Sequence, residues 1–315
     1  MRAPPAVRIF VAGGSGVIGR ALVPRLLAAD HVVAATTRSK EKIERLESLG
    51  ATAVLIDALD EEAVIGAVQS FRPDAVMNQL TSLPKHYNPR KLRPWYEATN
   101  RLRVEGTRIL LAAAAKVGAR RFIYQSIAFM YKNVGTQVVE EDAPLAINAP
   151  EPFGAAVRAT LEGERLATAT EGIVGVALRY GQLYGSGTYF AAGGDFQRQA
   201  RARMLPIVGS GAGIFSFLHV TDAATAAIAA LDRGEGVYNI TDDEPVAARD
   251  WIPAFCREVG APPPLHVPAW VARIVAGSFA SGVLTEGRGA SNRKAKLEMG
   301  WTPSHPSWRT GFSAV

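Results

Sequence analysis

Short hydrophobic runs alternate with amphipathic stretches through the first 180 residues of the chain. The runs carry few charges and are rich in Val, Ile and Ala, which is typical of strands buried on both faces of a parallel sheet. They cover residues 7–12, 31–36, 52–56, 75–80, 121–125 and 174–179. The stretches between them predict helices at 17–29, 40–49, 60–70, 94–117 and 155–171. The alternation predicts an α/β fold, a Rossmann doubly wound parallel sheet with right-handed crossovers.

The pattern changes after residue 180. Glycine and proline become more frequent, the segments shorten, and strands mix with helices. The expected strands are 214–218 and 236–240, and the expected helices lie near 221–232, 248–259 and 268–280. We therefore predict a Rossmann domain over 1–180 and a smaller mixed α/β substrate-binding lobe over 181–315, with at least one later strand returning to the main sheet.

The composition is that of a folded protein in a reducing compartment. Hydrophobic residues make up 48% of the 315 residues and charged residues 20%, so a sizeable core can form. The single cysteine, Cys256, excludes an internal disulfide framework and any multi-cysteine metal site. The five histidines show no metal-ligand spacing, so we predict no metal site. No signal peptide is evident, and the uncharged stretch 274–285 is too short to span a bilayer. We expect a soluble, cytoplasmic protein without a membrane partner.

The first predicted strand runs directly into a glycine-rich turn, GGSGVIG over 13–19, which opens a helix. Gly13 permits the tight turn, Gly16 lets a pyrophosphate approach the backbone, and Gly19 brings helix and strand close together. The free N–H groups at the start of the helix then face the anion. This junction predicts dinucleotide binding by six residues of the turn: Gly13, Ser15, Gly16, Val17, Ile18 and Gly19.

The end of the second strand indicates which dinucleotide binds. An NAD site usually has Asp or Glu there to bond the adenosine ribose, but the segment reads ATTRSK over 35–40 and holds no acid. Arg38 is suited to a charged fork on a 2′-phosphate, with Thr37 and Ser39 donating beside it. The alternative is a solvated arginine at a helix start. NADP(H) is therefore favoured over NAD(H).

Further segments match, in order, a known superfamily. They are IDA (56–58), NQLT (78–81), LRYGQLYG (178–185), FLHVTD (217–222), YNI (238–240) and GWTP (300–303). With the glycine turn, they make the chain resemble the extended short-chain dehydrogenase/reductase superfamily, which includes NAD-dependent nucleotide-sugar epimerases and dehydratases. The resemblance implies further cofactor contacts at Asp57, Ala58, Gln79, Leu80, Thr81, Gln125, Tyr180 and Gly181.

The catalytic signature of that superfamily is missing. The resemblance implies a Ser or Thr after the fifth strand, then a Tyr and a Lys four residues apart at the start of the next helix. Here the helix reads PFGAAVRATLEGE over 152–164. One alignment puts Ala156 and Thr160 at the Tyr and Lys positions. The other puts Phe153 and Val157 there, so neither restores the proton relay.

Three residues are candidate replacements for that relay. Ile127 takes the usual catalytic Ser position, and Ser126 lies one residue earlier, where a backbone-capping role is an equal alternative. Tyr131 is a candidate acid just past the carboxyl edge of the sheet, with a packed aromatic as the alternative. His86, an imidazole that could act as a general acid, belongs to the loop after the fourth strand.

That loop, 82–99, is rich in basic and aromatic residues. We interpret it as a substrate lid, with His86, Tyr87, Trp95 and Tyr96 as wall or acid–base groups. A solvated loop over packed aromatics is an equal alternative. Nucleic-acid binding has little support, because the net charge of +6 is scattered and forms no basic face.

The resemblance also bears on the substrate. Nucleotide-sugar members carry Arg-Asp just before FLHVTD, and the Arg clamps a diphosphate. Phe215 and Ser216 stand there, which favours a small substrate that is not a nucleotide sugar.

The leading hypothesis is an NADP(H)-dependent oxidoreductase acting on a carbonyl, imine or activated alkene. Two alternatives remain: an epimerase or dehydratase with tightly bound NAD(P), and a non-catalytic NADP-binding sensor or scaffold. The resemblance further implies a homodimer through the helices 94–117 and 155–171.

Overall fold

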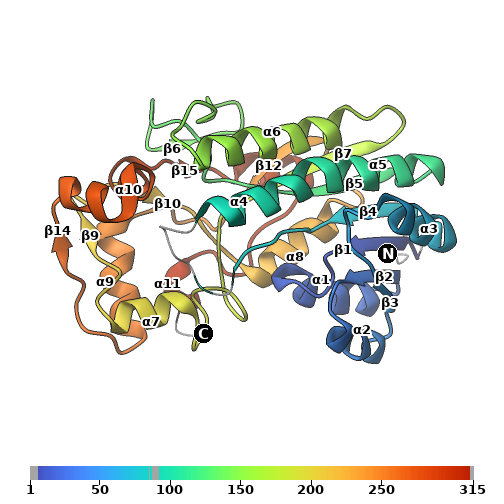
Figure 1. The fold of residues 1–315 in the computed structure, drawn as a ribbon, viewed down its shortest axis with the longest axis horizontal. Coiled ribbons are helices and arrows are strands. Elements are labelled where there is room, and N and C mark those ends of the chain that lie inside the picture. The colour runs from blue at the N-terminus through green and yellow to red at the C-terminus, as the bar shows by residue number, and fades with distance from the viewer. Residues whose placement is uncertain (1–5, 85, 87–91, 313–315) are drawn as a thin grey trace.

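The computed structural model describes residues 6–84, 86 and 92–312. Its centre is a seven-stranded sheet in the order β12-β7-β5-β4-β1-β2-β3, and every neighbouring pair is parallel. The predicted Rossmann α/β fold is thus confirmed (Figure 1). The strands are β1 Arg8–Ala12, β2 Val32–Thr37, β3 Thr52–Leu55, β4 Ala75–Asn78, β5 Arg121–Ile127, β7 Val174–Tyr180 and β12 Gly236–Ile240.

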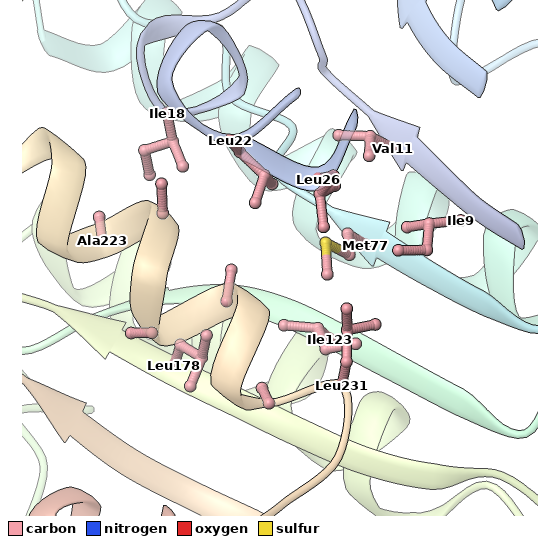
Figure 2. Close-up of a cluster of buried hydrophobic side chains, with 14 of the residues drawn as sticks. Ile9, Val11, Ile18, Leu22, Leu26, Met77, Ile123, Leu178, Ala223 and Leu231 are labelled. Carbon is pink, nitrogen blue, oxygen red and sulfur yellow. The ribbon is translucent and has the colours of Figure 1, made fainter. Parts of the chain in front are cut away.

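Helices cover both faces of the sheet, which is why its strands carry continuous apolar runs. One face packs against α1 (Val17–Ala28) and α8 (Val220–Ala229), whose apolar side chains meet those of the strands in Figure 2. The other face packs against α3 (Glu61–Phe71), α5 (Thr107–Lys116) and α6 (Phe153–Ala169).

The single helix expected over 94–117 is interrupted. The structure has α4 at Leu92–Arg101, a π-helical turn at Leu102–Gly106, and then α5. A π turn inserts an extra residue into the helix and rotates the helical residues after it, and such turns often occur at functional sites. A Cβ on Gly106 would lie 3.6 Å from the Leu80 side chain, so this turn sits against the loop after β4. The region expected at 40–49 is likewise divided, into a 3₁₀ turn Lys40–Lys42 and α2 Ile43–Ser48.

The later part of the chain forms a second cluster of short elements at one end of the molecule (Figure 1). The strand expected at 214–218 divides into β10 (Ile214–Phe215), which pairs with β13, and β11 (Phe217–His219), which pairs with β8. One later strand, β12, pairs with β7 at the edge of the main sheet.

The remaining elements are β6 Val138–Val139, β8 Gln182–Tyr184, α7 Asp195–Arg201, β9 Ile207–Val208, β13 Val246–Ala247, α9 Ala248–Glu258, β14 His266–Val267, α10 Ala269–Glu286, β15 Gly289–Ala290, a π-helical turn Ala295–Met299 and α11 Trp308–Gly311.

Aromatic side chains fill the core of this second cluster. Phe190 contacts the rings of Phe217, Trp251 and Phe255 at centroid distances of 5.4 to 5.8 Å. α10 runs longer than expected and contains a kink at Gly277, where φ is 89°. None of the helices in the described ranges has the length and apolar character needed to cross a membrane.

Candidate functional site

The turn between β1 and α1 is packed too tightly for side chains at three of its glycines, Gly13, Gly14 and Gly19. Gly13 has a φ of +85°, and a Cβ there would lie 2.8 Å from the carbonyl oxygen of Gln79 after β4. A Cβ on Gly19 would lie 2.3 Å from the carbonyl oxygen of Gly14. Helix α1 begins after Gly16 with no side-chain cap and no acidic residue in its first turn. Its first N–H groups therefore remain for an anion, and the cradle fits a pyrophosphate.

Hydroxyl groups at the end of β2 hold this turn in place. Thr36 Oγ1 accepts the first backbone N–H of the glycine turn at 3.0 Å. Ser15 donates its hydroxyl to Thr37 Oγ1 at 2.9 Å, and Thr37 Oγ1 also accepts the N–H of Ser39. Arg38 extends into solvent from the same strand end and has no partner among the described residues. Ser39, expected to donate to a 2′-phosphate, instead donates its hydroxyl to the Glu41 carboxylate, so Thr37 is the hydroxyl that remains beside this arginine.

The neighbouring strand ends supply two more of the predicted contacts. The exposed Asp57 carboxylate accepts the N–H of Leu59 at 3.0 Å and keeps its other oxygen for a ligand. The Gln79 side chain is buried, and neither of its amide atoms has a hydrogen-bond partner of good geometry within the described part of the chain. That amide lies near the Tyr180 hydroxyl and partly offsets the rise in the Tyr180 pKa that burial causes. A buried amide left this way fits a bound polar ligand. The other predicted positions at this edge are Ala58 and Gly181, which are buried, and Leu80, Thr81 and Gln125, which are half-buried.

Two of the three predicted proton donors belong to one buried polar network. Arg179 on β7 makes a two-bond fork to Glu164 on α6, with N–O distances of 2.8 and 2.7 Å. Ser126 donates its hydroxyl to the same carboxylate at 2.5 Å. Arg179 also donates to the Tyr131 hydroxyl at 2.9 Å, and Tyr131 donates to Asn239 at 2.6 Å. None of these five residues is more than 5% exposed.

The network uses the hydroxyl hydrogens of both Ser126 and Tyr131 inside the protein. Burial outweighs the effect of the adjacent Arg179 guanidinium and raises the Tyr131 pKa to about 12. Their proposed roles as proton donors stay predictions. His86, the third candidate, lies apart: its exposed ring contacts Asp195 at 3.3 Å and Arg198 at 3.0 Å. Tyr87 lies outside the described residues.

The start of α6 presents a largely apolar surface to the end of β5. Phe153 and Val157 form a small cluster with Ile127 and Met130, and Tyr96 from α4 packs against it. Thr160 turns inward and donates its hydroxyl to the backbone of its own helix. The sequence of α6 holds neither a Tyr nor a Lys. The only phenol in this cluster therefore comes from a different helix.

Comparison with known proteins explains this architecture. Residues 9–241 match the model of the NAD dependent epimerase/dehydratase family. The chain belongs to that family. It is an NAD(P)-dependent enzyme of the extended short-chain dehydrogenase/reductase type, so the resemblance drawn from the sequence motifs is confirmed.

Two curated relatives of this family member are named as reductases. A Streptomyces protein, the 3-diazoavenalumate denitrifying reductase, is 44% identical over 312 residues, which are 97% of this chain and 99% of the relative. The 2-alkyl-3-oxoalkanoate reductase of Stenotrophomonas maltophilia is 29% identical, covering 81% of this chain and 77% of the relative. The expectation of an oxidoreductase is therefore confirmed at this general level.

Solved structures of lower identity share the fold. The UDP-glucose 4-epimerase of Thermotoga maritima, crystallised with UDP-glucose, has a TM-score of 0.75 at 22% identity and covers 97% of this chain and 96% of its own. A human epimerase family protein crystallised with NADPH has a TM-score of 0.75 at 21% identity, covering 98% of both chains. Of these two neighbours, the human protein was crystallised with a nicotinamide dinucleotide.

The two residues before the FLHVTD motif, Phe215 and Ser216, have different surroundings. The ring of Phe215 is half-buried and packs on Phe217 and Trp251 at centroid distances of 6.3 and 5.3 Å. Ser216 is buried, and its hydroxyl accepts the backbone N–H of Ala290 at 2.8 Å. Neither side chain offers the charge that would hold a diphosphate.

One group of metal-ligand type gathers within the described ranges, although no spacing in the sequence predicts it. His219, Asp222 and His305 bring their ligand atoms within 4.8 Å of one another. However, the Asp222 carboxylate already accepts hydrogen bonds from both the backbone and the side chains of Ser304 and His305. The two imidazole rings stack with centroids 3.8 Å apart. The carboxylate is therefore engaged in anchoring the C-terminal segment to α8.

The sequence reasoning missed the Glu164–Arg179 pair and a buried Arg103 in the π-helical turn. A signal for one member was present, because Arg179 lies in LRYGQLYG (178–185), which matches the superfamily, whereas Glu164 lies in the helix whose catalytic signature is missing. Nothing in the sequence marks Arg103, because its burial depends on the π turn.

Proposed function

We propose that this protein is an NADPH-dependent reductase of a small substrate other than a nucleotide sugar, and that a diazo carboxylate is the first substrate class to test. The supporting observation is the apolar start of α6, which holds no Tyr or Lys where a proton relay is expected. The 44% identity to a denitrifying reductase along the whole chain directs attention to diazo compounds. Carbonyl, imine and activated alkene substrates come next in order of testing.

Denitrifying reduction needs little acid catalysis, and this agrees with the missing relay. A diazonium ion, R–N₂⁺, accepts one hydride at carbon, and the C–N electron pair leaves with dinitrogen to give R–H and N₂. No substrate oxygen has to be protonated in that reaction. The reduced nicotinamide supplies the hydride, so the protein is left to bind, orient and exclude water.

The chain's own residues support NADPH as the dinucleotide. The glycine turn, with Gly13 and Gly19, would hold the pyrophosphate against the first turn of α1. Arg38 would pair with the 2′-phosphate, and Gln79 would bond the ribose side of the cofactor with its buried amide.

Aromatic side chains support an aryl substrate. Phe215 takes the position where nucleotide-sugar enzymes are expected to carry an arginine, and its ring is half-buried on Trp251. Tyr96 adds a second half-buried ring at the start of α6. Such rings bind an apolar body.

The test uses a nitrogen-15-labelled aryl diazonium carboxylate and NADPH deuterated at the transferable position. We expect labelled N₂ in the gas phase and deuterium at the carbon that lost nitrogen. Release without enzyme, or without NADPH, sets the chemical background.

Other outcomes distinguish the alternatives. Co-purification with oxidised cofactor and no net NADPH consumption would favour an epimerase or dehydratase. Tight NADPH binding without turnover on diazo, carbonyl, imine and alkene substrates would favour a sensor. The homodimer stays a prediction, and light scattering of the purified protein measures it.

A further inference from the structure

One phenol beside the expected reaction position comes from α4. Tyr96 packs against the apolar cluster that contains Ile127 and Phe153, which take the positions of the expected catalytic Ser and, in one alignment, the expected Tyr. Its ring is half-buried, and its hydroxyl makes no hydrogen bond to any residue in the described ranges. A hydroxyl without a partner at the rim of an apolar cluster is available to a ligand.

A buried cation supports this phenol from the same helical segment. Arg103 lies in the π-helical turn after α4, is 8% exposed, and donates to Asn100 at 3.3 Å. Its guanidinium is close enough to Tyr96 to counteract the rise in the phenol's pKa that burial causes. Tyr124 on β5 and Glu164 on α6 are the other titratable groups near this guanidinium.

Close packing fixes the position of Arg103. A Cβ on Gly163 of α6 would lie 2.9 Å from the Arg103 carbonyl oxygen and 2.2 Å from the Tyr124 hydroxyl. α6 therefore meets the π turn backbone to backbone at this point. On its other side, the same turn sits against Leu80, just after the strand end next to the glycine turn. The π turn thus connects the expected cofactor edge to the phenol.

We propose that Tyr96 is the proton donor for neutral diazo substrates, which need a proton where a diazonium ion needs none, and that Arg103 is its positioning residue, so that α4 and the π turn provide a phenol–cation pair that α6 lacks. This inference rests on the proposed reductase function. A neutral diazo compound needs one proton as well as one hydride to give product and N₂. The Tyr96 O–H bond breaks, a substrate–H bond forms, the hydride comes from reduced nicotinamide, and the C–N pair leaves with N₂. Arg103 stabilises the phenolate until water reprotonates it.

The first experiment compares two substrates in Tyr96→Phe. With a neutral diazo ketone acid, kcat should fall by about 100-fold or more, the usual contribution of a positioned acid. With a diazonium acid, which needs no proton, kcat should stay unchanged. Tyr124→Phe is the matched control, because it removes a phenol near the same guanidinium that is 2% exposed and does not reach substrate. Equal losses on both substrates, or none on either, would overturn the proposal.

The second experiment separates the roles of the two residues by pH. Removing the guanidinium in Arg103→Gln should raise the pKa of the Tyr96 phenol. The decline of kcat at high pH should therefore shift to higher pH, and kcat itself should fall. Arg103→Lys should restore part of both. Tyr96→Phe should lack this decline altogether. A merely structural Arg103 would change stability and leave the position of the decline as in the wild type.

A third readout needs no turnover. The complex with NADP⁺ should bind a nitrogen-free hydroxyaryl carboxylate, and Tyr96→Phe should weaken that binding by about 2- to 12-fold, the value of one hydrogen bond. Unchanged binding would count against Tyr96 even if the wild type reduces diazo compounds. If the wild type reduces none of the substrates, the proposed function fails. The binding comparison between wild type and Tyr96→Phe, measured by calorimetry, still decides whether Tyr96 contacts the ligand.

Discussion

The region after β1 and β4 is shaped by close backbone packing, whereas the region around β5 and β7 is held together by hydrogen bonds between side chains. At the expected cofactor end, Gly13 and Gly19 leave no room for a Cβ, and the N–H groups of the first turn of α1 and the exposed Arg38 are left for a ligand. At the expected reaction end, Glu164 and Arg179 bond each other inside the core, and Ser126 donates to the same carboxylate. The first end keeps these groups for a ligand, and the other uses its polar side chains to hold the fold together.

This difference explains why relatives share a fold more readily than a reaction. A glycine turn is dictated by steric fit, so we expect a change to it to weaken cofactor binding. At the start of α6, the buried Phe153 and Val157 occupy positions where the superfamily is expected to carry catalytic side chains. The cofactor therefore follows from the fold, and the chemistry has to be argued from individual side chains.

The largest effect is expected at the reaction end, from Glu164→Gln. This change leaves the Arg179 guanidinium buried with a neutral partner, and both side chains are at most 4% exposed. The free energy of unfolding should fall by about 3–5 kcal/mol in urea titrations. Glu162→Gln, which breaks an exposed pair with Arg165, should cost less than about 1 kcal/mol. Equal losses for the two variants would remove the distinction between the two ends.

The next effect is expected at the cofactor end, from Arg38→Ala. Loss of a charge-assisted contact to the 2′-phosphate should weaken NADPH binding by about 1.5–3 kcal/mol and leave NADH binding as it is. Fluorescence titration of both dinucleotides measures this. Arg45→Ala, an exposed arginine on α2, is the control. If the binding of NADPH and of NADH weakens by the same amount, Arg38 does not contact the 2′-phosphate.

Gly19→Ala tests the steric part of the same end. The added methyl group meets the Gly14 carbonyl and should shift α1, at a cost of about 1–3 kcal/mol, seen as weaker NADPH binding. Gly66→Ala on α3 has no atom within 4 Å and should stabilise the protein by about 0.5–1 kcal/mol. Full NADPH affinity in Gly19→Ala would show that the turn tolerates a side chain and is not a tight cradle.

The smallest effect is expected outside both ends, at the start of α8. Burial, with a smaller contribution from His305, lowers the His219 pKa to about 4, below the 6.5 of a free imidazole. Between pH 6.5 and 4 the unfolded chain takes up a proton that the folded one refuses, so stability is lost as the pH falls. His219→Gln should reduce the drop in melting temperature between pH 7 and pH 5. An unchanged drop would assign the acid sensitivity to other groups.

The strands and the glycine turn could be predicted because each depends on local sequence. The buried runs around Val11 and Val176 read as strands, and the spacing of Gly13, Gly16 and Gly19 marks the turn before any contact is known. The polar network at Glu164 and the burial of Arg103 depend on partners far apart along the chain. Periodicity over 94–117 predicts one continuous helix. The π turn that interrupts it could not be predicted, because the turn packs against Gly163, a contact between segments far apart along the chain.

The edge position of β12 bears on how the chain is made. Strands β1 to β7 of the main sheet precede the second cluster in the chain, and β12 adds only to the outer side of β7. A ribosome releasing the chain from its N-terminus can therefore let the other six strands assemble first, since no later segment has to be threaded between them. An exchange of the second cluster would leave these strands unbroken, provided that α8 still returns to cover one face of the sheet.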